Sequence, residues 1–150
     1  MNVVLLVKNP RERVLRPSGA LVLLETIMYL LLALLFVKHF ACDYPLQSQW
    51  MLQKAAKKGW AFPLTAHAAL HGLFTVLIVN MMTDGDAGFA LLMGLADFCA
   101  HWAIDYWKAQ RTSAEFGSRR FWNLLGFDQL LHNLTYLAII FCYSLYMAGI

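Results

Sequence analysis

All five histidines of this chain take part in a pattern of metal-ligand residue types at four-residue spacing. The segment 39–44 reads His, aromatic, Ala, apolar, Asp, Tyr, and the segment 101–106 repeats that order. Each copy is followed by a second pair four residues apart, His67 with His71 and then Asp128 with His132. Imidazole and carboxylate groups together bind zinc and other divalent metals. The pattern therefore predicts a metal site that two similar halves of the chain build together.

The spacing of these pairs supports a shared site. Residues four apart on an α-helix differ by about 40° in direction and about 6 Å in height, so each pair lies on one stripe. We expect one or two divalent ions, with zinc first and manganese, magnesium or iron as alternatives. Either each half of the chain holds its own ion, or the halves share a pair of ions near a common axis. The predicted ligands are His39, Asp43, His67, His71, His101, Asp105, Asp128 and His132.

The elements that must position these residues are transmembrane helices. Hydrophobic residues make up 60% of the chain and charged residues 14%, whereas about 25% of a soluble domain is charged. A bilayer-spanning helix needs about 20 mostly apolar residues, and four segments qualify: 20–44, 63–82, 87–107 and 121–148. We therefore predict an all-α, polytopic membrane four-helix bundle made of two duplicated helical hairpins with pseudo-two-fold symmetry. Hairpin one spans 20–82 and hairpin two spans 87–148, in a single domain of residues 20–150.

The connections between the four segments differ in charge. Lys and Arg residues are frequent in the two longer connections, and none occurs in the short turn Asp84-Gly85-Asp86. By the positive-inside rule, the longer connections lie in the cytoplasm. The predicted ligands all lie near these connections, so the site is expected at the cytoplasmic end of the bundle.

Residues 1–19 form a basic tail, which four spans would place on the opposite side of the membrane. Two interpretations stay open. The tail is an amphipathic segment on the membrane surface, or the natural start of the chain is Met28. In the second case, Met28 begins the repeat-like part of the chain directly.

Carboxylates inside a membrane indicate function or pairing, because one at mid-bilayer costs about 2.5–3.5 kcal/mol. Bound metal offsets this cost. The simpler alternative is a set of His–Asp hydrogen bonds that hold the helices together. Asp97 lies four residues before His101, and three roles are open to it: a catalytic general base, a ninth ligand, or an acceptor that orients an imidazole. The orienting role is favoured.

Four further polar residues beside the predicted ligands are candidates for substrate binding. Lys108 and Arg111 lie just beyond Asp105 and could orient a phosphate, although topology alone also explains basic residues at this edge. Gln47 and Gln129 flank the motifs and could hydrogen-bond a ligand or substrate, or have an interfacial structural role.

The residue types of the predicted ligands argue against two known classes of metal site. Ferritin-like di-iron bundles use Glu-x-x-His motifs, whereas the carboxylates here are Asp. The His-Glu-x-x-His protease motif is absent because Ala68 follows His67. Mixed His and Asp ligation indicates a hydrolase in which metal activates water. Its expected substrate is a phosphoester or ester of a lipid or lipid-linked molecule at the cytoplasmic face.

The alternative function is non-enzymatic: a metal- or proton-handling protein, or a structural phage or bacterial membrane protein, that uses the same cluster. Nucleic acid is not an expected partner, because the net charge is only +3 and no binding motif occurs. The expected partners are the lipid bilayer, a lipid or phosphorylated substrate, and further copies of the chain in a homo-oligomer.

Three motifs carry a resemblance to a known family. Segments 39–50 (HFACDYPLQSQW), 101–105 (HWAID) and 128–132 (DQLLH) resemble those of small bacterial and phage integral membrane proteins, a family catalogued as a domain of unknown function. The likeness covers roughly residues 28–148. It implies a four-helix membrane fold, the same ligand candidates and a location in the bacterial inner membrane, and it supplies no activity.

Overall fold

The computed structural model describes residues 19–111 and 115–150, and in these ranges the chain is helical with no strand. The predicted all-α class is confirmed. Of the predicted tail 1–19, residues 1–18 lie outside the described residues. The elements are α1 (Gly19–Asp43), the short 3-10 helix η1 (Met51–Ala55), α2 (Ala61–Met82), α3 (Ala87–Ala109) and α4 (Arg119–Met147).

Local sequence signals fix several helix ends. The Asp86 side chain accepts a hydrogen bond from the backbone N–H of Phe89 at 3.0 Å and caps α3. Ser118 caps α4 in the same way through the N–H of Phe121, at 3.1 Å. Between α2 and α3 the chain reverses through Asp84 and Gly85, both at positive φ (51° and 91°). The predicted tight turn is thus confirmed.

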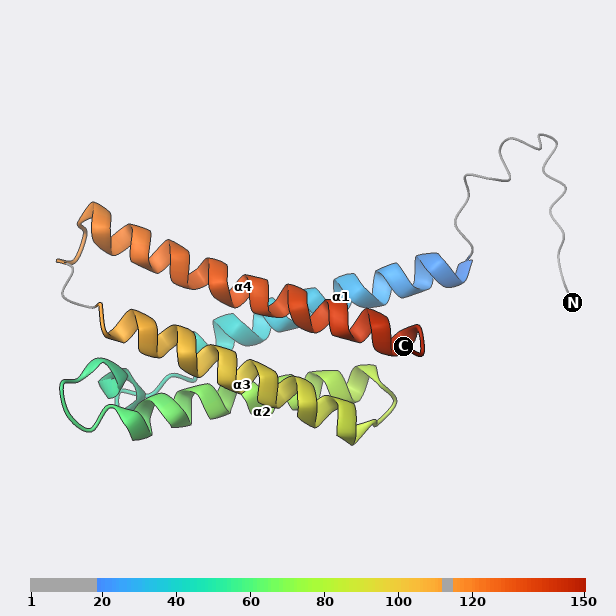
Figure 1. The fold of residues 1–150 in the computed structure, drawn as a ribbon, viewed down its shortest axis with the longest axis horizontal. Helices are drawn as coiled ribbons and strands as arrows, with labels where there is room; N and C mark the ends of the chain where they lie inside the picture. The colour runs from blue at the N-terminus through green and yellow to red at the C-terminus, as the bar shows by residue number, and fades with distance from the viewer. Residues whose placement is uncertain (1–18, 112–114) are drawn as a thin grey trace, which may run out of the picture.

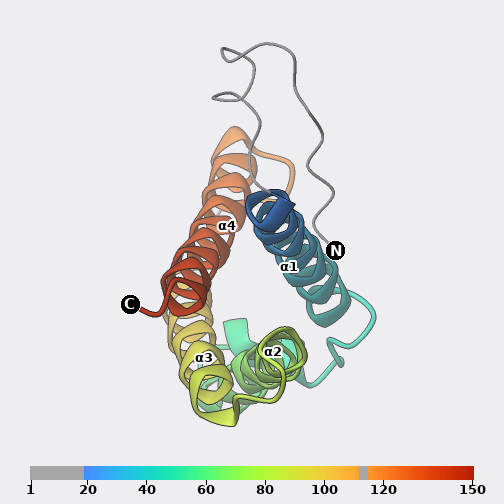
Figure 2. The ribbon, with the colours of Figure 1, turned by 90° about the vertical axis from the view of Figure 1, so that its right-hand side faces the viewer.

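Successive long helices run in opposite directions along the long axis of the bundle (Figure 1). Both longer connections lie at one end of the bundle, and the α2–α3 turn lies at the other end with the C-terminus (Figure 1). Viewed along its length, the bundle has α1 and α4 on one side and α2 and α3 on the other (Figure 2). This order brings the end of α1, the start of α2, the end of α3 and the start of α4 to the same level.

The distribution of side chains is that of a membrane protein. All four long helices are long and apolar enough to cross a membrane. Large apolar side chains such as Leu73, Leu91 and Leu137 are more than half exposed on the outer surface, whereas histidine and aspartate side chains are buried inside. In water this arrangement would be costly; in a bilayer it leaves hydrocarbon against hydrocarbon. The structure therefore indicates a multi-pass membrane protein.

Two glycines let α2 and α3 approach closely. A Cβ built on Gly72 would lie 2.8 Å from the carbonyl oxygen of Gly94 and 2.9 Å from Cβ of Phe98. A Cβ on Gly94 would overlap the side chain of Val76. Small residues commonly allow such contact between transmembrane helices. This contact holds α2 against α3, while the predicted duplication and pseudo-two-fold symmetry stay predictions.

Candidate metal centre

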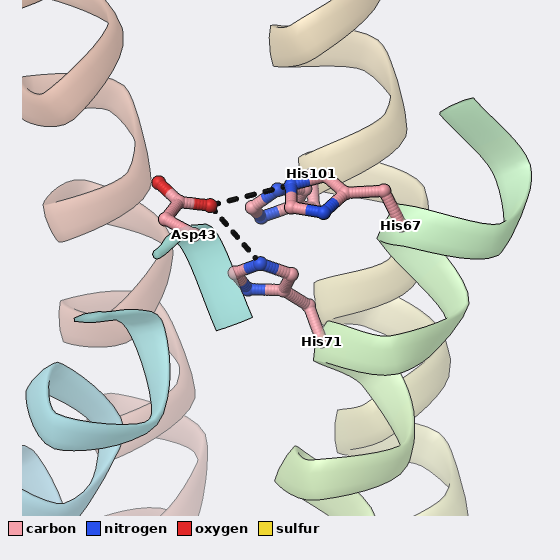
Figure 3. A group of neighbouring side chains, drawn as sticks. All are labelled: Asp43, His67, His71 and His101. Atoms are coloured by element: carbon pink, nitrogen blue, oxygen red, sulfur yellow. Dashed lines mark ion pairs between the residues drawn. The ribbon is translucent and has the colours of Figure 1, made fainter. Parts of the chain in front are cut away.

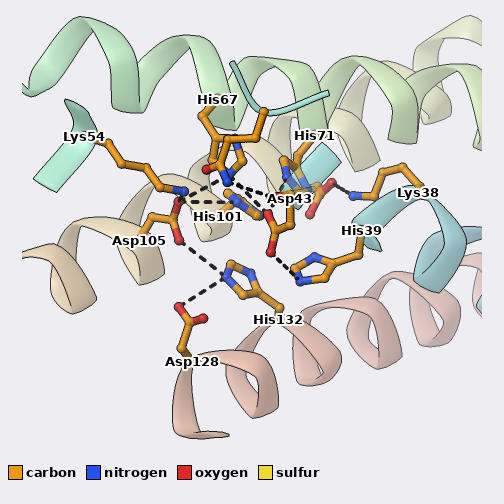
Figure 4. Close-up of polar contacts among 12 residues, drawn as sticks. Lys38, His39, Asp43, Lys54, His67, His71, His101, Asp105, Asp128 and His132 are labelled. Carbon is orange, nitrogen blue, oxygen red and sulfur yellow. Dashed lines mark hydrogen bonds and ion pairs between the residues drawn. The ribbon is translucent and has the colours of Figure 1, made fainter. Parts of the chain in front are cut away.

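Each long helix contributes two of the eight predicted ligands to one cluster inside the bundle (Figure 4). Seven of the eight side chains are buried, and Asp43 is half-buried. The four-residue spacing turns both members of each pair inward, as expected for one helical stripe. Their ligand atoms form three overlapping groups, each with atoms within 4.8 Å of one another: Asp43, His67, His71 and His101; His39, His101 and His132; Asp105, Asp128 and His132.

The first group joins three helices (Figure 3). Oδ1 of Asp43 lies 3.2 Å from Nε2 of His67 and 3.2 Å from Nε2 of His71. The His101 ring stacks on His71 with 3.6 Å between the ring centroids. Zinc bonds of about 2.0–2.1 Å in tetrahedral geometry place ligand atoms about 3.3 Å apart. The distances from the Asp43 carboxylate match that spacing.

The hydrogen bonding of these histidines distinguishes ligands from structural pairs. Both ring nitrogens of His67, His71 and His101 are buried without a hydrogen-bond partner. The contacts to Asp43 have the length of hydrogen bonds but not their direction. A neutral imidazole keeps one N–H, and an unsatisfied buried donor costs about 1–3 kcal/mol. Nitrogens that converge near a carboxylate without bonding to it fit a cation between them better than a His–Asp hydrogen-bond network.

His39 differs from the other histidines because its two nitrogens have partners. Nδ1 lies 2.7 Å from the Tyr136 hydroxyl, and Nε2 lies 3.2 Å from Oε1 of Gln129. Nε2 is also 3.2 Å from Oδ2 of Asp43. Since an amide oxygen can only accept, Nε2 carries the proton and Nδ1 accepts from Tyr136. His39 is thus arranged to hold the Asp43 carboxylate in place.

The third group lies beside two lysines. Nε2 of His132 is 3.6 Å from Oδ1 of Asp128 and 3.7 Å from Oδ1 of Asp105. Nζ of Lys54 is 2.6 Å from Oδ2 of Asp105, and Nζ of Lys108 is 2.7 Å from Oδ2 of Asp128. Each carboxylate therefore directs one oxygen at a lysine and the other at the imidazole. The third group offers three protein ligands rather than four.

A cavity of about 230 Å³ opens beside the cluster, and we call it the polar cavity. Three of the four predicted substrate-binding residues line it, and Arg111 does not. Arg111 instead lies over the Trp107 ring, 4.5 Å from its centroid, and donates to the Trp107 carbonyl. The polar cavity is lined by Asp43, Tyr44, Gln47, Leu52, Lys54, Asp105, Lys108, Leu125 and Gln129.

Asp97 belongs to none of the three ligand groups. Its Oδ2 accepts hydrogen bonds from Nζ of Lys38 and Oγ1 of Thr75, both at 2.6 Å. Lys38 also lies over the Tyr136 ring, 4.6 Å from its centroid, and Tyr136 in turn contacts His39. Lys38 and Tyr136 thus connect Asp97 to His39.

The sequence-based interpretation missed Lys38. The available signal was its position: Lys38 follows the apolar run 28–37 and directly precedes His39, within the first predicted span. An ionisable residue within a span is a functional candidate by default. Thr75 and Tyr136 gave no such signal, because single hydroxyl groups are common in transmembrane helices.

The ligand groups do not follow the division between the predicted hairpins. The first group combines Asp43, His67 and His71 with His101 from the other half, and His101 is also a member of the second group. His132 connects the second group to the third. Of the two arrangements considered from sequence, this geometry resembles ions shared by both halves.

A family model described as "Protein of unknown function (DUF3307)" matches residues 31–149. Most of the chain lies in this range, and the resemblance to an uncharacterised family is confirmed. No curated protein and no solved structure matches the chain. The description names no activity, so the site itself must indicate the function.

Proposed function

The chain belongs to this DUF3307 family, and from the geometry of the cluster we propose that it is a membrane-embedded, metal-dependent hydrolase. Its substrate is a phosphoester or ester of a lipid or lipid-linked molecule. The site lies at the cytoplasmic face of the bacterial inner membrane, where the positive-inside rule puts the basic connections. One observation carries the proposal: His67, His71 and His101 have buried ring nitrogens without hydrogen bonds, and one ligand atom of each lies within 4.8 Å of an Asp43 oxygen.

Charge supports a cation in the cluster. Three carboxylates, those of Asp43, Asp105 and Asp128, face two ammonium groups, those of Lys54 and Lys108. With neutral imidazoles, one formal negative charge is left inside a membrane-spanning bundle. A buried charge without compensation is strongly disfavoured. One divalent cation offsets this charge and uses the free ring nitrogens at the same time. A second ion would need a hydroxide or an anionic substrate bound with it.

The ligand numbers favour two ions with different roles. Asp43, His67, His71 and His101 provide four ligands, which is the count of a closed structural zinc site. Asp105, Asp128 and His132 provide three, the count of a catalytic zinc site with an open position for water. Asp105 also lines the polar cavity. A metal ion with such an open position would lower the pKa of a water bound there and would polarise an ester oxygen.

The residues of the chain supply binding and orientation. Lys54 and Lys108 line the polar cavity and place two positive charges where a phosphate or a developing oxyanion would lie. In hydrolysis, the oxygen of water bonds to phosphorus or to the acyl carbon, and the ester bond to the leaving oxygen breaks. The departing alcohol takes a proton from the same water. Asp105 lines the cavity and faces His132, so a metal held by the third group would lie beside that water.

The alternative, a transport path, requires polar groups through the opposite half of the bundle. There the core is apolar, with Leu31, Leu35, Val79, Met93 and Ile139 all buried. This core favours a closed site over a path. A purely structural metal site is the second candidate, because the four-ligand group alone would satisfy it.

Elemental analysis of detergent-purified protein tests the proposal. We expect stoichiometric zinc, or manganese after reconstitution, in the wild type and in Gln110→Ala, a control at the end of α3. His101→Ala should lose the ion of the first group, whereas Asp128→Asn should lose the ion of the third group alone. The wild type should hydrolyse a member of a panel of lipid phosphoesters and esters, and Asp128→Asn should not. Protein without bound divalent metal, before and after reconstitution, would refute the proposal.

A further inference from the structure

A second cavity opens between α1 and α4 on the outer surface of the bundle. Its volume is about 280 Å³, and its lining is mostly apolar. Phe36 and Phe40 of α1 are 43% and 61% exposed there, on a surface that faces lipid hydrocarbon. α1 and α4 contact each other and cross at an angle (Figure 1). We call this cavity the lipid-facing groove; it is lined by Phe36, His39, Phe40, Tyr44, Gln129 and Asn133.

The groove and the polar cavity adjoin each other. Tyr44 and Gln129 line both. One end of the combined site is apolar and open to the bilayer, and the other end presents Lys54 and Lys108. The combined site therefore suits an amphiphile, with the hydrocarbon chain at the apolar end and the anionic head at the lysines.

Two amide groups along this route have unused hydrogen-bonding capacity. Asn133 is exposed on the lipid-facing side of α4, and its side chain makes no hydrogen bond to a described residue. Gln47 donates to the Asp43 carbonyl at 2.6 Å, but its Oε1 is buried without a partner. An amide left without a hydrogen bond in an apolar environment is costly. Both amides are therefore positioned for polar groups of a ligand, Asn133 near the chain and Gln47 near the head.

We propose that the substrate of the site is a membrane lipid with a phosphate headgroup, which enters sideways from the bilayer through the groove between α1 and α4. This inference rests on the proposed function and specifies its substrate class. The phosphate lies between Lys54 and Lys108, and the first part of one hydrocarbon chain lies against Phe36 and Phe40. Neither cavity alone reaches the roughly 300 Å³ of a typical small-molecule site, which fits a ligand that occupies both.

Photo-crosslinking tests this route. The probe is phosphatidic acid with a diazirine in one acyl chain, in phosphatidylcholine vesicles that contain the full-length protein. We expect labelled peptides from α1 and α4 around the groove, and competition by unlabelled phosphatidic acid. Diacylglycerol, which lacks the phosphate, and inorganic phosphate, which lacks the chain, should compete about tenfold less well, a difference that corresponds to about 1.4 kcal/mol.

Two substitutions distinguish lipid bound in the groove from lipid that contacts the rest of the surface. Asn133→Trp fills the groove and should reduce labelling about tenfold. Leu137→Trp adds the same ring one helical turn further along α4, outside the groove lining, and should leave labelling unchanged. Both variants should keep the metal content of the wild type.

The outcomes distinguish the two proposals. Metal-loaded protein that is labelled equally in both variants, or labelled mainly on α2 and α3, overturns the lipid route and leaves the metal site standing. Protein without metal refutes the proposed function, whatever the labelling. Equal competition by inorganic phosphate would assign the polar cavity to a soluble phosphate compound and would also overturn the lipid route.

Discussion

Lys38 of α1 and Asp97 of α3 form an ion pair inside the bundle, with 2.6 Å between Nζ and Oδ2 and both side chains 1% exposed. Thr75 of α2 donates to the same carboxylate oxygen, and the Tyr136 ring of α4 lies beside the ammonium group. The pair therefore contacts all four helices. Lys38 directly precedes His39 and Asp97 lies one turn before His101, so the pair bounds the ligand cluster on the side of the apolar core.

Removing one partner of this pair should destabilise the bundle strongly. Lys38→Met or Asp97→Leu leaves a buried charge without its partner, which typically costs about 3–5 kcal/mol. The double variant should recover most of this loss, because two apolar side chains leave no buried charge. Unfolding in mixed detergent micelles measures the effect, with Glu25→Gln on the exposed surface of α1 as the control. Equal stability of single variants and wild type would contradict this account.

The close contact between Gly72 and Gly94 should not tolerate a larger side chain at either position. Gly72→Ala places a methyl group 2.8 Å from the Gly94 carbonyl oxygen, so α2 must move away from α3. Such overpacking costs about 1–3 kcal/mol. Because His67 and His71 lie on α2 and His101 on α3, bound metal should decrease as well. Unfolding and elemental analysis measure the two effects.

Gly126→Ala is the matched control for this prediction. A Cβ on Gly126, within α4, meets no atom within 4 Å. Alanine is favoured over glycine in a helix by up to about 1 kcal/mol, so this variant should be as stable as the wild type or slightly more stable. If both substitutions had the same effect, helix propensity rather than helix packing would control the stability.

The Asp86 cap of α3, at the end of the bundle opposite the cluster, should make the stability of the protein depend on pH. Hydrogen bonds from the Phe89 backbone N–H and the Tyr146 hydroxyl hold the pKa of Asp86 below its ordinary value of 3.8. A carboxylate with a lowered pKa in the folded state contributes stability above its ordinary pKa. That contribution is lost as the pH falls below 3.8 through the pKa of the folded state.

Asp86→Ala removes this contribution. The variant should be less stable than the wild type at neutral pH, and the difference should shrink as the pH is lowered below 3.8. Unfolding at a series of pH values measures it. Asp84→Asn, in the same turn, is the control for loss of a negative charge. A difference between Asp86→Ala and wild type that is constant across the series would assign the effect to packing of the turn.

The helices and the inward stripes could be predicted because they depend on local sequence. The predicted start of the third span at residue 87 is the observed start of α3, where Asp86 provides the cap. The predicted end of the first span at residue 44 is one residue beyond α1. Pairs such as His67 and His71 share a face whatever the neighbouring helices do, so their spacing alone indicated a common direction.

Contacts between helices could not be predicted from the same signals. Whether Asp43 lies closest to His71 or to His132 depends on the rotation and offset of α1 against α2 and α4, and no local pattern specifies these. The pairing of Lys38 with Asp97 has the same origin. The short helix η1 was also not predicted, because its sequence has no apolar run and its fold depends on the connection that carries Lys54 to Asp105.

Bound metal should appear as a gain in stability that depends on His101. A ligand at 100 times its dissociation constant stabilises the folded state by about 2.7 kcal/mol, so chelation should lower the unfolding temperature of the wild type and added zinc should restore it. His101→Ala should be less stable and should respond less to both treatments, since it disrupts the four-ligand group. His39→Ala should keep most of the response, because the nitrogens of His39 bind Tyr136 and Gln129. A wild type that chelators leave unchanged, with metal removal confirmed by elemental analysis, would show that hydrogen bonds alone hold the cluster together.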